Sequence, residues 1–267
     1  MYLENREGKR LYYKKEGQGK PLLLIHGAAV DADYFEVLSS YLSRKYCVMT
    51  YDRRGASRSE TAEDYSLEAQ TRDAADVLRA LADAPALVVG CSLGALIAMR
   101  LMATEPALVE RLFLHELPAM FFPEIQGTEE MAECRKMCEL VEQGKARRAL
   151  LRFLLLMNGE SDERAVPHTP EKIDQQMKNG TLYMQHEFAE LFFAPEEAFS
   201  LPALNGKKIC CLIGDSKRNS LFARSAELLA ERLDCPVRYV PGGHNAPYDL
   251  PLEFACVLLG LLELEGE

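Results

Sequence analysis

Apolar residues follow two alternating patterns along this chain. Short runs that are apolar at every position, as in strands buried on both faces, alternate with longer segments of helical spacing. The predicted strands are 21–26, 47–52, 86–89, 111–116, 207–214 and 237–240, with an edge hairpin from 1–3 and 10–15. The helices predicted between them are 34–42 with Asp33 as its cap, 66–81, 95–101, 221–233 and a last one from about Pro251. The alternation predicts an α/β fold with a mostly parallel sheet.

This alternation is interrupted once, by residues 118–200, which contain no convincing strand. Helices are predicted there from Thr128 to Gly144, over 146–157, from Thr169-Pro170 to a stop at Asn179-Gly180, and over 182–193. The sequence therefore predicts a core of residues 1–117 and 201–267, with a helical cap of residues 118–200 inserted into it.

The most informative stretch is Gly90-Cys91-Ser92-Leu93-Gly94, which follows a predicted strand and precedes a predicted helix. A sharp turn here holds the serine with strained backbone dihedrals, and a Cβ at Gly90 or Gly94 would collide with the neighbouring strand or helix. The turn raises the hydroxyl above the sheet edge and places the next amides at a helix N-terminus, where negative charge is stabilised. Ser92 is therefore the candidate nucleophile.

A serine hydroxyl is a weak nucleophile until a base takes its proton. His244 lies in the glycine-rich loop 241–247, directly after the last predicted strand, so its ring can point over the same sheet edge as Ser92. His26 also follows a predicted strand, and we expect it to brace the loop that begins at Gly27. His244 is therefore the candidate base.

These stretches resemble the α/β-hydrolase family, which includes esterases, cofactor-free haloperoxidases, haloalkane dehalogenases, epoxide hydrolases and carbon–carbon bond hydrolases. The resemblance rests on His26-Gly27, on Tyr51-Asp52-Arg53-Arg54-Gly55, on the serine turn and on Gly242-Gly243-His244. It implies an eight-stranded, mostly parallel sheet with helices on both faces and a helical cap inserted after the sixth strand.

The resemblance also implies roles for individual residues. Ser92 would be the nucleophile and His244 the base, and the amides of Ala28 and Leu93 would form the oxyanion hole. Family members that cleave carbon–halogen bonds or epoxides carry aspartate at the position of Ser92, so both of those reactions are disfavoured.

The acid that orients the base has two candidates. The family most often places it three residues after the glycine that ends the strand 207–214, and Lys217 occupies that position. Asp215 stands only one residue after Gly214, where it can instead cap the following helix. Glu116 ends the preceding strand, a location from which some family members supply the acid. Either carboxylate can in principle reach the imidazole Nδ1; Glu116 is favoured and Asp215 is the alternative.

Composition narrows the partners. A net charge of −10 disfavours nucleic acid and anionic membranes. No apolar leader segment and no run of membrane-spanning length is present, so we expect a cytoplasmic protein. The eight cysteines form no zinc pattern and suit a reducing compartment. We expect no cofactor, no metal ion and a small-molecule substrate; the oligomeric state stays open.

The sequence thus predicts a serine hydrolase that cleaves a small-to-medium, largely apolar ester or thioester through an acyl-enzyme, beneath a cap rich in Met and Phe. A carbon–carbon bond hydrolase or a perhydrolase would use the same triad and differ only in its pocket. A ligand-binding protein of the same fold, without turnover, is the alternative outside the enzymes.

Overall fold

A computed structural model describes residues 1–158, 169–217 and 220–263 of the 267-residue chain. Its centre is an eight-stranded sheet in the order β1-β2-β4-β3-β5-β6-β7-β8. The first two pairings, β1 with β2 and β2 with β4, are antiparallel, and all later pairings are parallel. The strands are β1 (Tyr2–Glu4), β2 (Arg10–Glu16), β3 (Pro21–Ile25), β4 (Cys47–Tyr51), β5 (Ala86–Cys91), β6 (Val109–His115), β7 (Ile209–Gly214) and β8 (Val237–Val240). The predicted mostly parallel, eight-stranded sheet is confirmed.

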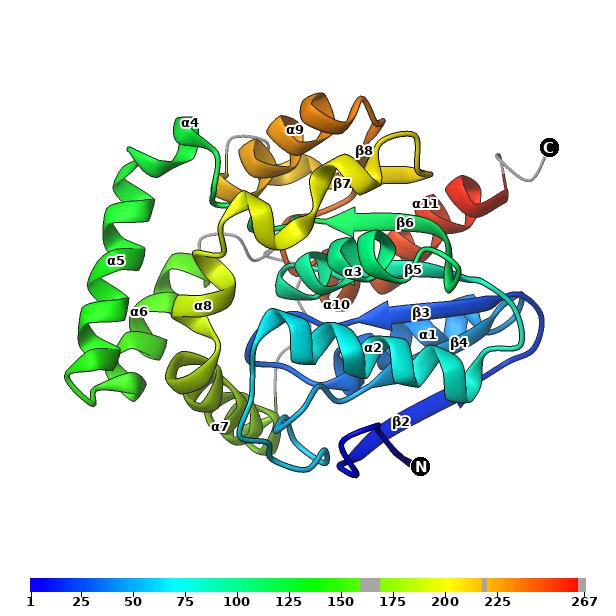
Figure 1. The fold of residues 1–267 in the computed structure, drawn as a ribbon, viewed down its shortest axis with the longest axis horizontal. Helices are drawn as coiled ribbons and strands as arrows, with labels where there is room; N and C mark the ends of the chain where they lie inside the picture. The colour runs from blue at the N-terminus through cyan, green and yellow to red at the C-terminus, as the bar shows by residue number, and fades with distance from the viewer. Residues whose placement is uncertain (159–168, 218–219, 264–267) are drawn as a thin grey trace.

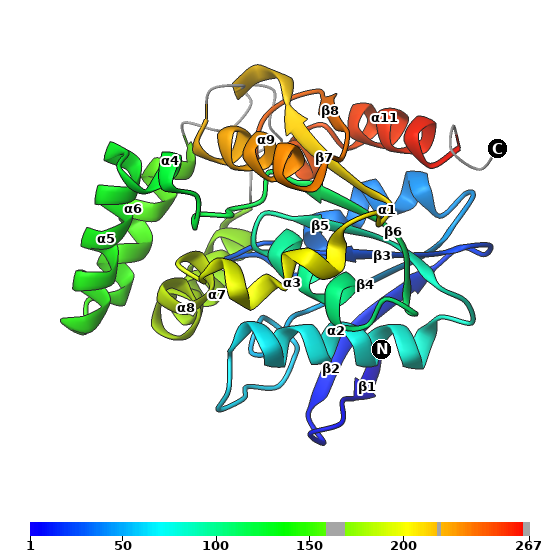
Figure 2. The ribbon, with the colours of Figure 1, turned by 45° about the horizontal axis from the view of Figure 1, so that its top comes forward.

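Helices cover both faces of the sheet (Figures 1 and 2). Along β3, Leu22 and Leu24 pack into one apolar cluster, and Leu23 and Ile25 into the other, because successive side chains of a strand point to opposite faces. The first cluster includes residues of α1 (Glu36–Leu42), α10 (Ala246–Asp249) and α11 (Pro251–Glu263). The second includes residues of α2 (Leu67–Leu81), α3 (Leu93–Thr104) and α9 (Leu221–Leu233). The parallel strands β3 to β7 are thus buried on both faces, as their sequences predict, whereas the edge strand β8 is partly exposed.

The described residues between β6 and β7 form helices and turns and no strand. Figure 1 shows this segment at the end of the sheet to which the arrows of β3 and β6 point. Thr128 and Thr169 cap their helices as predicted, accepting hydrogen bonds from the amides of Met131 and Lys172. The helices are α4 (Pro123–Gln126), α5 (Glu129–Glu142), α6 (Ala146–Asn158), α7 (Pro170–His186) and α8 (Phe188–Phe192), followed by 3₁₀ turns at Glu196–Phe199 and Leu201–Leu204.

The predicted helix stop at Asn179-Gly180 is wrong, because α7 continues through both residues to His186. The side chain of Asn179 is buried, accepts a hydrogen bond from the Ser57 amide (3.0 Å) and donates one to the Val30 carbonyl (3.3 Å). A Cβ at Gly180 would lie 2.5 Å from a methyl of Leu150 in α6 and 3.2 Å from the Cβ of Ala29 in the loop after β3. These two residues therefore join α7 to the loop after β3 by close packing, and tertiary contacts override their low helix propensity.

The predicted cap of the helix after β3 is also wrong. Asp31, and not Asp33, accepts from a backbone amide at the start of the 3₁₀ turn Ala32–Phe35 that precedes α1. Asp33 instead pairs with Lys14 at 2.6 Å and with Arg58 at 3.1 Å.

None of the described helices has the length and apolar character that crossing a bilayer requires.

Candidate active site

Ser92 stands on a sharp turn between β5 and α3, with φ 52° and ψ −124°. A Cβ at Gly90 would lie 2.5 Å from the carbonyl oxygen of Gly94, and a Cβ at Gly94 would lie 2.1 Å from that of Ile25. Only glycine fits at either position, because the strand and the helix approach each other without room for a side chain. The sequence predicts this turn correctly, including the reason for both glycines.

The loop after β3 lies directly against this serine. A Cβ at Gly27 would be 3.0 Å from Ser92 Cβ and 3.6 Å from its Oγ. In the described ranges neither the Ala28 amide nor the Leu93 amide donates a hydrogen bond to another group. Leu93 is the first residue of α3, where the helix dipole adds partial positive charge. Two amides near the serine are therefore available to an oxygen of a bound ligand.

Glu116 and His244 face each other at the same end of the sheet. Glu116 directly follows β6, and its Oε2 lies 3.7 Å from Nδ1 of His244. This distance exceeds that of a hydrogen bond, so the contact is a close pairing of two buried side chains. The other carboxylate oxygen, Oε1, accepts from the Gly214 amide at 2.8 Å. Burial acts to raise the pKa of Glu116, but His244, His115 and the Gly214 amide outweigh it and hold that pKa below its ordinary value.

Asp215, the other candidate acid, is exposed and points to a different partner. Its Oδ1 accepts from the amide of Gly242 at 3.0 Å. It therefore supports the backbone of the loop that carries His244. The predicted role of Asp215 as a cap for the next helix is wrong, because Ser220 caps α9 by accepting from Ala223.

The His244 ring is also packed from the side, with the ring of Phe222 in α9 centred 4.3 Å away. Ser92, Glu116 and His244 follow β5, β6 and β8, three strands whose carboxyl ends share one edge of the sheet. Within the described part of the chain, no hydrogen bond joins Ser92 Oγ to the ring. Hydrogen bonds between a hydroxyl and a base in an active site are often long or poorly aligned before a ligand is bound.

His26 is a structural histidine, as the sequence predicts. Its Nε2 accepts from the Arg53 amide at 3.1 Å, and its Nδ1 lies 2.9 Å from the Gly27 carbonyl oxygen. Because an amide can only donate, Nε2 must be the bare nitrogen and Nδ1 must carry the proton. Burial, helped by the nearby Arg53 charge, lowers the pKa of His26 to about 3. The ring is therefore neutral at physiological pH and ties the Gly27 loop to the end of β4.

His115, at the end of β6, is a second buried histidine, but it lacks hydrogen-bond partners such as those of His26 among the described residues. It is fully buried, its ring meets Phe254 edge-on at 5.2 Å, and neither ring nitrogen has a hydrogen-bond partner among the described residues. Burial lowers the pKa of His115 from 6.5 to about 4. Folding must therefore exclude a proton that the unfolded chain binds below pH 6.5.

We expect His115→Leu to weaken the dependence of stability on acid. A histidine whose pKa is lower when folded costs stability as pH falls from 6.5 towards about 4. Removing it should reduce the slope of the unfolding free energy by about one proton, ~1.4 kcal/mol per pH unit, in that interval. Urea unfolding of parent and variant across this range measures the slope, with a mildly alkaline buffer as the reference. Parallel slopes would contradict the assignment.

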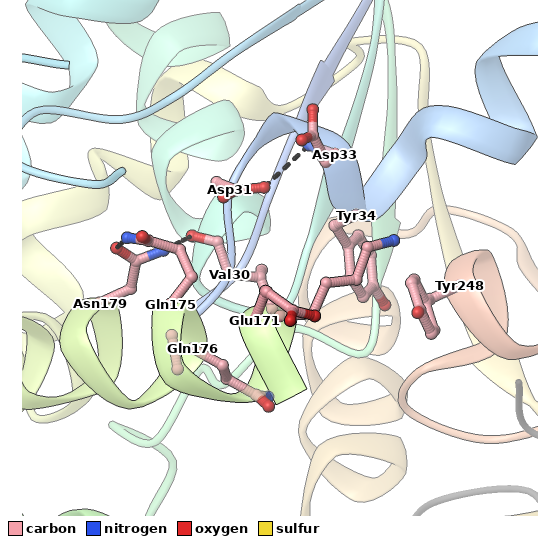
Figure 3. Close-up of a pocket in the computed structure, with 11 residues that line it drawn as sticks. Val30, Asp31, Asp33, Tyr34, Glu171, Gln175, Gln176, Asn179 and Tyr248 are labelled. Atoms are coloured by element: carbon pink, nitrogen blue, oxygen red, sulfur yellow. Dashed lines mark hydrogen bonds between the residues drawn. The ribbon is translucent and has the colours of Figure 1, made fainter. Parts of the chain in front are cut away.

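A cavity of about 200 Å³ lies beside the Gly27 loop, between that loop, α7 and α10 (Figure 3). It is lined by Ala29, next to Ala28, and by Tyr248 of the helix that begins after the His244 loop. The rings of Tyr34 and Tyr248 stack at 5.8 Å on its wall. Ser92 does not line it. The cavity thus lies beside the loop that carries Ala28, and its lining combines the two tyrosine rings with the carboxylates of Asp31, Asp33 and Glu171.

The phenylalanines of α6 and α8 pack closely on one another. Phe188 is fully buried and contacts Phe153, Phe192 and Phe193 at ring distances of 6.0, 5.1 and 6.1 Å. These rings belong to the apolar cluster that also includes residues of α2 and α3. No cluster of side chains able to hold a metal ion occurs among the described residues.

The sequence interpretation missed Arg53, Glu187 and the Gly214 amide as parts of this site. The first two lie far apart in the chain, and their pairing has no sequence signal. Backbone strain marks part of this site, because Ala29, Ser92 and Glu116 have positive φ without being glycine, although Ser57, Ser200 and Asp234 share this feature. Such strain persists only where the surrounding structure enforces it, and it concentrates at functional sites.

Known proteins resemble this chain in sequence and structure. The model of the alpha/beta hydrolase family matches residues 22–255. The chain is 30% identical over 270 residues to the uncharacterized hydrolase YraK of Bacillus subtilis (strain 168), covering 97% of this chain and 94% of that protein. A solved esterase from Exiguobacterium antarcticum has a TM-score of 0.77 at 18% identity, covering 98% of this chain and 99% of its own. A hydrolase from Pseudomonas aeruginosa has a TM-score of 0.74 at 21% identity, covering 98% of each chain. At these identities the two structures bear on the fold alone.

Proposed function

The chain belongs to the alpha/beta hydrolase family, and we propose that it is a serine hydrolase that cleaves a small-to-medium, largely apolar ester or thioester. The observation that carries the proposal is the strained Ser92 turn, set at the same sheet edge as the pair of Glu116 and His244. The relative YraK of Bacillus subtilis, which is itself described as a hydrolase, supports the same broad reaction class.

In the proposed mechanism, Ser92 Oγ attacks the acyl carbon while His244 takes the hydroxyl proton. The amides of Ala28 and Leu93 stabilise the oxyanion, a contribution of about 3 kcal/mol for each donor in comparable sites. The protonated His244 gives its proton to the departing alcohol or thiol as the acyl-enzyme forms. A water molecule, deprotonated by His244, then attacks the acyl-enzyme and releases the acid. Glu116 orients His244 and stabilises its charged form.

Residues 118–200 form, in this proposal, a lid over a core of residues 1–117 and 201–267. Its helices lie beyond the carboxyl ends of the strands, on the side where Ser92 stands (Figure 1). The cavity beside the Gly27 loop, walled by Val30, Tyr34 and Tyr248, would receive one arm of the ester. Its volume of about 200 Å³ suits a short or medium chain.

A panel of p-nitrophenyl esters from acetyl to octanoyl tests the proposed reaction. Release of p-nitrophenol should be measurable for the shorter members and should require Ser92. Absence of turnover with the whole panel, together with no labelling by a serine-directed phosphonate, would overturn the assignment as a serine hydrolase.

We expect Gln176→Trp to discriminate against longer esters. Gln176 is a half-buried residue of α7 that lines the cavity (Figure 3), and an indole there would fill part of it. KM for the octanoyl ester should rise about tenfold, ~1.4 kcal/mol, while the acetyl ester is barely affected. Lys178→Trp is the control, because Lys178 is exposed on the same helix and does not line the cavity. An equal effect of the two variants would argue against this cavity as a substrate site.

A further inference from the structure

The carbonyl oxygen of Gly27 is held by two donors, both buried. The Nδ1–H of His26 lies 2.9 Å away, and Nη2 of Arg53 donates to the same oxygen at 3.2 Å. Through its other terminal nitrogen, Nη1, Arg53 donates to Oε2 of Glu187 at 2.7 Å. The Arg53 and Glu187 side chains are only 3% and 2% exposed. The buried ion pair of Arg53 and Glu187 thus donates a hydrogen bond to the peptide group that joins Gly27 to Ala28.

That peptide group carries the proposed oxyanion donor at its other end. The Gly27 carbonyl and the Ala28 N–H belong to one planar trans unit, so they point in opposite directions. A donor that fixes the carbonyl direction also fixes where the Ala28 N–H points. If this peptide rotated, the carbonyl would face the oxyanion and repel it.

We propose that Arg53 and Glu187 are positioning residues that hold the Ala28 amide in the oxyanion hole and couple it to the cap. The inference rests on the proposed hydrolase function. Glu187 lies at the junction of α7 and α8, so the anion of the pair comes from the cap, whereas Arg53 follows β4 in the core. The geometry of the cap helices is thereby transmitted to the peptide of Gly27 and Ala28.

A purely structural role would not need charges at this place. Replacing a buried ion pair by apolar residues of similar volume is often neutral or stabilising, whereas breaking it from one side is strongly destabilising. The guanidinium, however, bridges two acceptors at once, one on the cap and one on the loop. An apolar pair can fill the same space but cannot hold the Gly27 carbonyl. The double replacement therefore separates packing from positioning.

The test is the double variant Arg53→Met/Glu187→Leu, assayed with the acetyl ester and with a trifluoromethyl ketone, which forms an oxyanion adduct on serine. The melting temperature should stay near that of the parent and KM should change little. kcat should fall about tenfold to a hundredfold, a partial loss of one oxyanion donor. The inhibition constant of the ketone should rise by the same factor. A parental kcat and inhibition constant in a well-folded double variant would overturn the inference.

Two further variants make the outcome decisive. Asp73→Asn weakens an equally buried pair with Arg54, whose guanidinium donates to other backbone carbonyls than that of Gly27, and should lower stability without changing kcat or ketone affinity. If the double variant does not fold, Glu187→Gln is measured in its place. It should show a smaller loss in kcat and ketone affinity with KM unchanged, and no loss would overturn the inference. Activity that persists in Ser92→Ala would instead refute the hydrolase proposal itself.

Discussion

Alanine in place of Ser92 is expected to abolish ester turnover and leave the fold intact. In the proposed mechanism Ser92 forms the bond to the acyl group, and loss of such a nucleophile lowers kcat by about a millionfold in a comparable triad. A fluorophosphonate should add one adduct to the parent protein, on Ser92, and none to the variant. Intact-mass spectrometry gives the number of adducts, and p-nitrophenol release gives kcat.

Ser40→Ala is the matched control, because Ser40 is an exposed serine of α1 whose hydroxyl donates to the Val37 carbonyl of its own helix. It should keep full turnover and full labelling. The strained dihedrals of Ser92 add a second check, since Ser92→Gly should be inactive and yet no less stable than Ser92→Ala. Persistent labelling of Ser92→Ala would place the nucleophile elsewhere.

The parts of the site that depend on local physics can be read from the sequence. The turn at Ser92 needs glycines at two fixed positions because a strand and a helix approach each other there, so Gly90 and Gly94, placed between a predicted strand and a predicted helix, predict it. The central strands can also be predicted from the sequence, because β3, β4 and β5 are buried at every position and therefore consist almost entirely of apolar residues. Parallel strands then bring their carboxyl ends to one edge, which predicts that Ser92 and His244 share an edge.

Contacts between distant segments have no such local signal. Asn179 and Gly180 carry the residue types of a helix stop, but they serve the contact of α7 with the core. The ion pair of Arg53 with Glu187 joins the segment after β4 to the junction of α7 and α8, 134 residues later in the chain. Nothing in either segment identifies the other, so only the folded geometry reveals the pair.

The choice of acid shows the same limit. Sequence alone leaves Glu116 and Asp215 open, because both follow strands whose ends meet at the His244 loop. The difference lies in direction: Glu116 approaches Nδ1 of His244 at 3.7 Å, and Asp215 accepts from the backbone of Gly242 at 3.0 Å. One carboxylate faces the ring, and the other supports the loop that carries it.

We therefore expect Glu116→Gln to lower kcat by about four orders of magnitude, as the loss of the orienting carboxylate does in a comparable triad. Glutamine keeps the size of the side chain and an oxygen to accept from the Gly214 amide at 2.8 Å, so the fold should survive. It loses the charge that stabilises protonated His244. The measurement is kcat for one ester at one pH, with the melting temperature as a check on folding.

Asp215→Asn is the matched control, because it removes one carboxylate charge from the same region. An asparagine oxygen can still accept from the Gly242 amide, so the His244 loop should keep its place and kcat should fall only a few-fold. Glu116→Gln thus removes the charge that faces the His244 ring, whereas Asp215→Asn changes a contact with the backbone of the His244 loop. A large loss in Asp215→Asn with near-parental turnover in Glu116→Gln would reverse the assignment. It would return the acid to the position after β7, because the orienting charge must come from the carboxylate whose removal stops the reaction.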